Sequence, residues 1–127
     1  MEPSHAHISG QCRQVNDIVS LVGDKWSVLV VVMLGEGKQR FSALKREIDG
    51  ISQKMLTVTL RRLERDGYLT RTIYPTIPPR VDYELTALGY DLLVPVRALG
   101  RFAMDNRSRV LAARDAYDSR RLAEAAE

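Results

Sequence analysis

The chain of 127 residues has one cysteine, Cys12, and few aromatic residues, which make up 6% of it. A single thiol forms no internal disulfide, so a disulfide-bonded secreted scaffold is excluded and a cytoplasmic protein is expected. The longest apolar run, Val28 to Leu34, is too short to cross a bilayer, and the first ten residues lack the pattern of a secretory signal. Paired catalytic carboxylates, a nucleophile elbow and a glycine-rich phosphate loop are all missing, so we expect no enzymatic activity.

The charge of the chain is small in total but unevenly distributed. The formal net charge is +3, whereas residues 38–80 contain ten Lys or Arg and four acids, a balance of +6. The rest of the chain therefore carries −3. A basic middle segment on a nearly neutral chain is typical of a protein that binds nucleic acid.

Residues 51–67 predict one helix with two different faces. Ser52 can cap its N-terminus, and Gly67 stands where a left-handed residue ends a helix. Helical spacing makes one apolar stripe of Leu56, Leu60 and Leu63. The opposite face carries Lys54, Thr57, Val58, Arg61 and Arg65. Such a face suits phosphates and base edges in a major groove, although an ordinary solvated face is the alternative.

A β-hairpin is predicted directly after this helix. Residues 68–74 and 80–85 alternate in polarity and are rich in β-branched and aromatic side chains. Between them, residues 75–79 contain three prolines, which cannot lie inside a sheet but can stiffen an exposed loop. A basic helix followed by a hairpin with a stiff tip ending in Arg80 is the order of a winged helix-turn-helix. Residues 39–41 predict one further short strand.

The remaining segments predict further helices with recognisable starts. Helical spacing of apolar residues predicts a first helix over residues 15–22. Asp24 can cap a second helix, Ser42 a third and Thr86 a long fourth one, in which Pro95 predicts a kink.

Several motifs along the chain resemble one family. They are Leu21–Ser27 (LVGDKWS), Arg40–Leu44 (RFSAL), Gly50–Thr57 (GISQKMLT), Leu60–Leu69 (LRRLERDGYL) and Tyr74–Thr86 (YPTIPPRVDYELT), with Cys12 before them and Leu88–Gly89 after them. Together they resemble the HxlR-type winged helix-turn-helix regulators, which belong among the MarR-like folds. The resemblance covers roughly residues 12–104. It departs from the family pattern at Arg13, where members commonly have proline.

The resemblance implies a homodimeric transcription factor that binds double-stranded DNA at a pseudo-palindromic operator. It implies dimerisation through residues 15–22 and through the long helix from Leu88 onward. We expect a fold that is mainly α with a small β-wing. Its parts are a disordered tail over 1–11, a winged helix-turn-helix domain with dimerisation helices over 12–104, and a helical extension over 105–127. The charges of that extension balance, so we do not expect it to bind phosphate.

Candidate DNA contacts follow from matching these positions to the family pattern. Gln53, Lys54 and Thr57 are candidates for base edges, whereas Arg61 and Arg65 suit the backbone. The full set of candidates is Ser42, Ser52, Gln53, Lys54, Thr57, Arg61, Arg65, Pro78, Pro79 and Arg80.

Several of these side chains have a second interpretation. Gln53 can equally cap its helix or lie against the core. Arg80 at the wing suits phosphate or the minor groove, and a solvated turn residue is the alternative. Arg62 lies toward the side of its helix and can pair with a neighbouring acid. Trp26 predicts core packing rather than a ligand pocket.

Cys12 is the candidate for a signal-sensing residue. It is expected immediately before the first helix and beside Arg13, and both features favour the thiolate. Such a thiolate can react with oxidants or electrophiles, as the matching cysteine does in some members of the family. The alternative is a small buried residue at the dimer interface. His5 and His7 with Cys12 make a poor metal site on an unstructured tail, so we expect no metal or cofactor.

These observations predict a sequence-specific DNA-binding regulator, with modification of Cys12 as a candidate switch. The main alternative is a winged-helix module that binds an acidic protein partner without specific DNA binding. A third alternative is a thiol-dependent enzyme that uses Cys12, which would require turnover of an electrophile.

Overall fold

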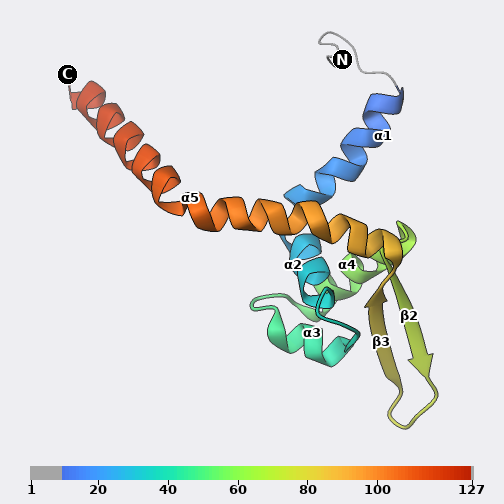
Figure 1. The fold of residues 1–127 in the computed structure, drawn as a ribbon. Coiled ribbons are helices and arrows are strands. Elements are labelled where there is room, and N and C mark those ends of the chain that lie inside the picture. The colour runs from blue at the N-terminus through green and yellow to red at the C-terminus, as the bar shows by residue number, and fades with distance from the viewer. Residues whose placement is uncertain (1–9, 127) are drawn as a thin grey trace. The chain divides into compact units, whose positions relative to one another are not determined.

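The computed structural model describes residues 10–126, and its helices and strands follow the predicted order (Figure 1). The elements are α1 Gly10–Val19, the 3-10 helix η1 Ser20–Gly23, α2 Lys25–Leu34, β1 Gln39–Arg40, α3 Phe41–Glu47, α4 Gln53–Arg65, β2 Leu69–Tyr74, β3 Arg80–Leu85 and α5 Ala87–Ala126. The chain divides into two compact units, the first extending to Val96 and the second beginning at Arg97. The fold is mainly α with a small β-wing, as predicted.

The three strands form one antiparallel sheet in the order β1-β3-β2. The hairpin pairs Leu69 with Leu85 at its base and Tyr74 with Arg80 at its outer end, which confirms the predicted wing. The short strand β1 pairs Gln39 with Tyr83, so the wing is joined to the segment that leads into α3.

The core lies between α2, α4 and the base of the wing. The three leucines of the predicted apolar stripe on α4 are buried, which confirms that face of the helix. Trp26 is half-buried and packs against this core, in agreement with the sequence prediction. The buried apolar side chains of the cluster include Leu21, Val30, Val31, Leu34, Leu44, Ile48, Ile51, Tyr68, Leu69, Tyr83, Leu85 and Leu93.

Three predicted caps are present in the structure. Asp24 accepts a hydrogen bond from the backbone N–H two residues further on, at 3.1 Å. Ser52 accepts one from the N–H three residues on at 3.0 Å, and Thr86 does the same at 3.1 Å. Gly50 and Gly67 have φ values of +83° and +85°, so each turn around α4 uses the left-handed conformation that glycine permits.

Two helix starts differ from the prediction. No proline or β-branched residue interrupts residues 10–14, and α1 begins at Gly10; Cys12 therefore lies in the first turn of the helix and not before it. The cap predicted at Ser42 is wrong, because α3 begins at Phe41 and Ser42 is already helical. Arg40 holds the cap position without a side-chain hydrogen bond, since strand β1 keeps the backbone extended up to that residue. Of the predicted tail, residues 1–9 lie outside the described residues.

The second unit consists of α5 from Arg97 onward. Helix α5 continues to Ala126 without interruption, so the predicted helical extension is helical. Every described side chain in this unit is exposed except for the half-buried Asn106. The unit therefore has no apolar core of its own within the described residues.

Gly89 in the first turn of α5 allows that helix to approach the base of the wing. A Cβ atom at this position would lie 2.1 Å from the carbonyl oxygen of Tyr68 and 2.9 Å from a side-chain carbon of Leu85. The first contact is with backbone, which cannot rotate away as a flexible side chain can.

We expect the Gly89→Ala variant to have a lower free energy of unfolding, by roughly 1–3 kcal/mol, because overpacking forces the helix away from the sheet. The matched control is Gly100→Ala in the same helix, where an added Cβ meets nothing within 4 Å. This control is expected to be neutral or stabilising, by up to about 1 kcal/mol. Urea denaturation of both variants measures the difference, and equal stabilities would contradict the close approach.

Candidate nucleic-acid interface

The outer face of α4 is basic and exposed. Lys54, Arg61 and Arg65 are exposed along this face, as are Ser52 and Gln53 at its N-terminal end. Thr57 is half-buried, and Val58 is exposed between the cations. The first turn of the helix contains no acid, so the N-terminus of α4 keeps its partial positive charge.

Ion pairing divides the ten cations of residues 38–80 into two groups. Arg62, Arg71 and Arg80 pair with Asp24, Glu64 and Asp82, respectively. The other seven have no ion-pair partner among residues 10–126, and all are exposed. They are Lys38, Arg40, Lys45, Arg46, Lys54, Arg61 and Arg65. The charge that remains available to an anionic partner therefore lies on α4, on α3 and around β1.

Arg62 connects α4 to the start of α2. Its guanidinium contacts both the carboxylate of Asp24 and the hydroxyl of Ser27, which confirms the predicted pairing of Arg62 with an acid. Ser27 is completely buried and also donates a hydrogen bond to Asp24 at 2.9 Å. Burial raises the pKa of Asp24, but hydrogen bonds from Ser27, Arg62 and the Trp26 N–H outweigh it, so the net pKa lies below 3.8.

Arg80 is held against the wing by two contacts. Its Nε lies 3.2 Å from Oδ1 of Asp82, a carboxylate that is only 5% exposed. Its guanidinium carbon lies 4.5 Å from the centre of the Tyr74 ring, the side chain opposite it in the hairpin. The sequence prediction did not include Asp82. The signal was present, because Arg80 and Asp82 are two residues apart on a predicted strand and their side chains therefore lie on one face of it.

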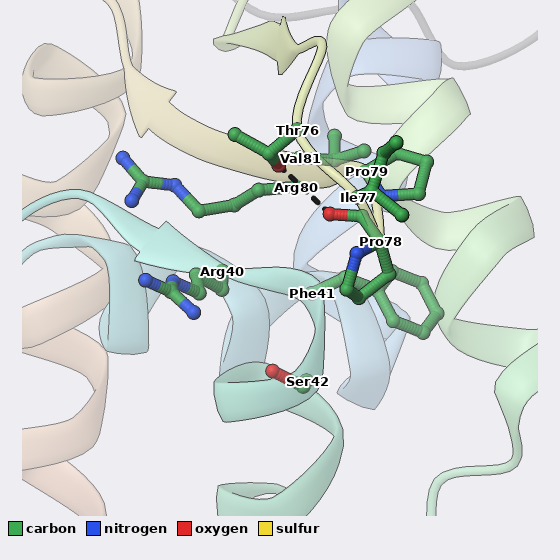
Figure 2. A pocket seen from close by; sticks show the side chains of 9 residues that line it. All are labelled: Arg40, Phe41, Ser42, Thr76, Ile77, Pro78, Pro79, Arg80 and Val81. Atoms are coloured by element: carbon green, nitrogen blue, oxygen red, sulfur yellow. Dashed lines mark hydrogen bonds between the residues drawn. The ribbon is translucent and has the colours of Figure 1, made fainter.

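A cleft joins the wing to the start of α3. It has a volume of about 630 Å³, and Figure 2 shows the guanidinium groups of Arg40 and Arg80 extending to the same side of it. Phe41 and Pro78 lie away from these groups in the same view. The cleft is lined by Arg40, Phe41, Ser42, Thr76, Ile77, Pro78, Pro79, Arg80 and Val81.

The cleft brings together four of the predicted site residues, Ser42, Pro78, Pro79 and Arg80. Arg40 was not among the predictions. Its place in the cleft follows from the pairing of β1 with β3, in which Arg40 stands opposite Asp82. That pairing links parts of the chain about forty residues apart, and no local sequence pattern indicates it.

Cys12 lies on α1 and is half-buried. None of the ten residues of this helix is buried, and its apolar side is exposed at Val15, Ile18 and Val19. His5 and His7 lie outside the described residues, and within residues 10–126 no group of three or more His, Cys, Asp or Glu side chains is arranged to hold a metal ion. None of the described helices is both long and apolar enough to span a membrane.

Comparison with known proteins identifies the family. The model of the HxlR-like helix-turn-helix family matches residues 21–110. This chain belongs to the HxlR-like family. The resemblance predicted from the sequence motifs is thereby confirmed, and the chain is a member of a family of transcriptional regulators.

HxlR-like relatives are similar to this chain over most of their length. The HTH-type transcriptional regulator YtfH of Escherichia coli K12 is 46% identical over 99 residues, which cover 78% of this chain and 79% of YtfH. The structure of a ytfH transcriptional regulator from Salmonella typhimurium has a TM-score of 0.76 at 41% identity and covers 84% of this chain and 95% of that one. The structure of the redox regulator HypR in its reduced form has a TM-score of 0.73 at 33% identity, and the match covers 78% of this chain and 98% of HypR.

The lowered pKa of Asp24 predicts how the stability of this HxlR-like domain depends on pH. A carboxyl group whose pKa is lower in the folded state stabilises the fold above its unfolded pKa, and this contribution is lost as pH falls through the folded pKa. We expect the difference in unfolding free energy between the native protein and Asp24→Asn to be largest above about pH 5 and to shrink as pH falls below about 4. Denaturant titrations at several pH values measure it, and a difference that is constant with pH would contradict the role of the charge.

Proposed function

We propose that this HxlR-like protein is a cytoplasmic, homodimeric transcriptional regulator that binds a specific pseudo-palindromic operator. The observation that carries the proposal is the group of seven exposed cations without an ion-pair partner in the described residues. Three of them, Lys54, Arg61 and Arg65, follow the outer face of α4. Exposed cations on a helix of this fold have the charge and reach to neutralise DNA phosphates.

The contacts divide between base reading and positioning. In the proposed complex α4 lies in the major groove, where Gln53, Lys54 and Thr57 in its first turns reach base edges. Arg61 and Arg65 contact phosphates further along the helix. Ser42 and Arg40, which line the cleft beside the wing, hold a phosphate on the flanking backbone.

The exposed apolar side of α1 supports the homodimer. A helix of ten residues with no buried side chain gains too little from its own hydrogen bonds to persist in water. A second copy of the chain that covers Val15, Ile18 and Val19 would supply the missing burial. Two-fold symmetry would then place two copies of α4 about 34 Å apart, one helical turn of DNA.

Lys54→Ala and Arg61→Ala test the DNA-binding face. We expect each variant to lose operator affinity on the order of tenfold or more while it remains a folded dimer. Loss of a phosphate contact also lowers the slope of log affinity against log salt concentration by about 1. Fluorescence anisotropy on a duplex selected from randomised DNA measures affinity, and light scattering measures the oligomeric state.

Arg62→Ala is the matched control, since this neighbour of Arg61 points toward Asp24 and Ser27. It should lower the unfolding free energy by about 1 kcal/mol and weaken DNA binding less than Arg61→Ala does at a temperature where it is folded. Native affinity in both Lys54→Ala and Arg61→Ala would contradict the assignment of α4. A selection that enriches no duplex, with binding to acidic proteins instead, would favour the interaction module.

We further propose that oxidation of Cys12 switches the dimer between DNA-binding states. The relative HypR is described as a redox regulator, and Cys12 lies on α1, the helix proposed to hold the two protomers together. As the only cysteine, Cys12 can form a disulfide only with the partner's copy or with a small thiol. In the first case two thiols release two protons and two electrons to an oxidant such as diamide. A covalent link at α1 would change the spacing of the two α4 helices.

Cys12→Ser tests this switch. We expect diamide to change the operator affinity of the native protein by at least about fivefold, because a shift of the α4 spacing misaligns one half-site. The Cys12→Ser variant should bind with the same affinity before and after treatment. Anisotropy titrations measure both, and non-reducing electrophoresis shows whether a cross-linked dimer forms. An unchanged native affinity after complete thiol oxidation would leave Cys12 as a structural residue.

A further inference from the structure

The tip of the wing, residues 75–79, carries no charge and exposes one large apolar side chain. Ile77 is 100% exposed, the highest value among the large apolar residues of the described chain. On either side stand Pro75 and Thr76, and Pro78 and Pro79. A single exposed apolar side chain is ordinary on a protein surface. Ile77 differs from the others in its place, because it stands in an uncharged loop that lines the cleft beside the start of α3.

The tip is held in one shape before any partner binds. The Thr76 N–H donates a hydrogen bond to the carbonyl oxygen of Tyr74 at 2.8 Å. The Thr76 hydroxyl donates one to the carbonyl oxygen of Pro78, also at 2.8 Å (Figure 2). The three prolines restrict the backbone further. An apolar side chain on a preorganised loop loses little conformational entropy when it is buried by a partner.

The cation expected to enter a groove from the wing is not at the tip. Arg80 begins strand β3, and its guanidinium is bound to Asp82 and stacked on Tyr74. Its charge is therefore compensated within the wing. The fully exposed apolar side chain of the tip is that of Ile77.

The tip adjoins the helix-turn-helix. Ile77 and Pro78 line the same cleft as Arg40 and Ser42 at the start of α3 (Figure 2). Arg40 has no ion-pair partner among the described residues. A DNA backbone held by Arg40 and Ser42 would bring the adjacent minor groove next to Ile77.

We propose that Ile77 enters the minor groove beside the site read by α4 and selects A·T pairs there. The inference rests on the proposed function and identifies one of its specificity-determining residues. A guanine exposes its 2-amino group in the minor groove, whereas A·T pairs expose no donor. An apolar side chain packed against that amino group would remove its water without replacing the hydrogen bond, which is unfavourable. Ile77 would therefore favour base pairs that lack a hydrogen-bond donor in the minor groove. An arginine at this place would instead respond to the width and the negative electrostatic potential of the groove.

The test separates the minor groove from the major groove by chemistry. In a duplex selected by the native protein, each flanking adenine is replaced in turn by 2,6-diaminopurine, which adds a minor-groove amino group and leaves the major-groove edge of adenine. Flanking G·C pairs are also replaced by inosine·C, which removes that amino group. Anisotropy gives the affinity of the native protein, of Ile77→Ala and of the matched control Ile73→Ala, an exposed isoleucine on strand β2 away from the tip.

We expect at least one diaminopurine substitution to weaken native binding by on the order of fivefold, and inosine to restore the binding lost to a G·C pair. In Ile77→Ala the diaminopurine penalty should fall below about twofold, whereas Ile73→Ala should keep it. The proposal would be overturned if the added amino group left the DNA affinity of the native protein unchanged. It would also be overturned if Ile77→Ala lost as much affinity to diaminopurine as the native protein does. If the protein selects a specific duplex but its affinity does not respond to the flanking substitutions, only the role of Ile77 is overturned. If no duplex is selected at all, the proposed function is overturned as well.

Discussion

The carboxylate of Asp24 is the contact on which the DNA-binding domain depends most. It caps α2, accepts a hydrogen bond from the buried hydroxyl of Ser27 and pairs with Arg62 of α4. One group therefore begins one helix and holds another against it. Because α4 also buries its leucine stripe in the core, its rotation about its own axis is restricted from two sides. The proposed role of α4 in reading base edges requires this restriction, since a small rotation would replace one set of exposed side chains by another.

The same pairing determines which cations are compensated within the protein. Arg61 and Arg62 are adjacent and both are exposed, yet only Arg62 is paired, with Asp24. Glu64 similarly pairs with Arg71 of the wing, at 3.5 Å. Asp24 and Glu64 thus compensate cations that link one element to another. The cations without an ion-pair partner among the described residues lie on α4, on α3 and around β1. An excess of exposed positive charge is what the proposed binding to DNA phosphates requires.

The wing combines an arginine, Arg80, whose charge is compensated by Asp82, with an apolar tip. Asp82 is almost fully buried and tolerable there because Arg80 pairs with it and Tyr74 covers the guanidinium. This arrangement fixes the orientation of the two strands at the point where the proline-rich loop begins. The loop can therefore present Ile77 in a defined position, which is what the proposed contact with the minor groove requires.

Local sequence determined the helices, their caps and the family, while the tertiary structure decided which charged residues remain available. Asp24, Ser52 and Thr86 were predictable as caps because a cap bonds to backbone two or three residues away. The start of α3 was not, because the pairing of β1 with β3 extends the backbone at Arg40 and displaces Ser42 into the helix. Likewise, helical spacing placed Arg61 on the outer face and Arg62 toward the side of α4, but it could not name the acid that pairs with Arg62, because Asp24 lies 38 residues away along the chain. Side-chain contacts between distant segments depend on the packing of the whole core, which no single stretch of sequence encodes.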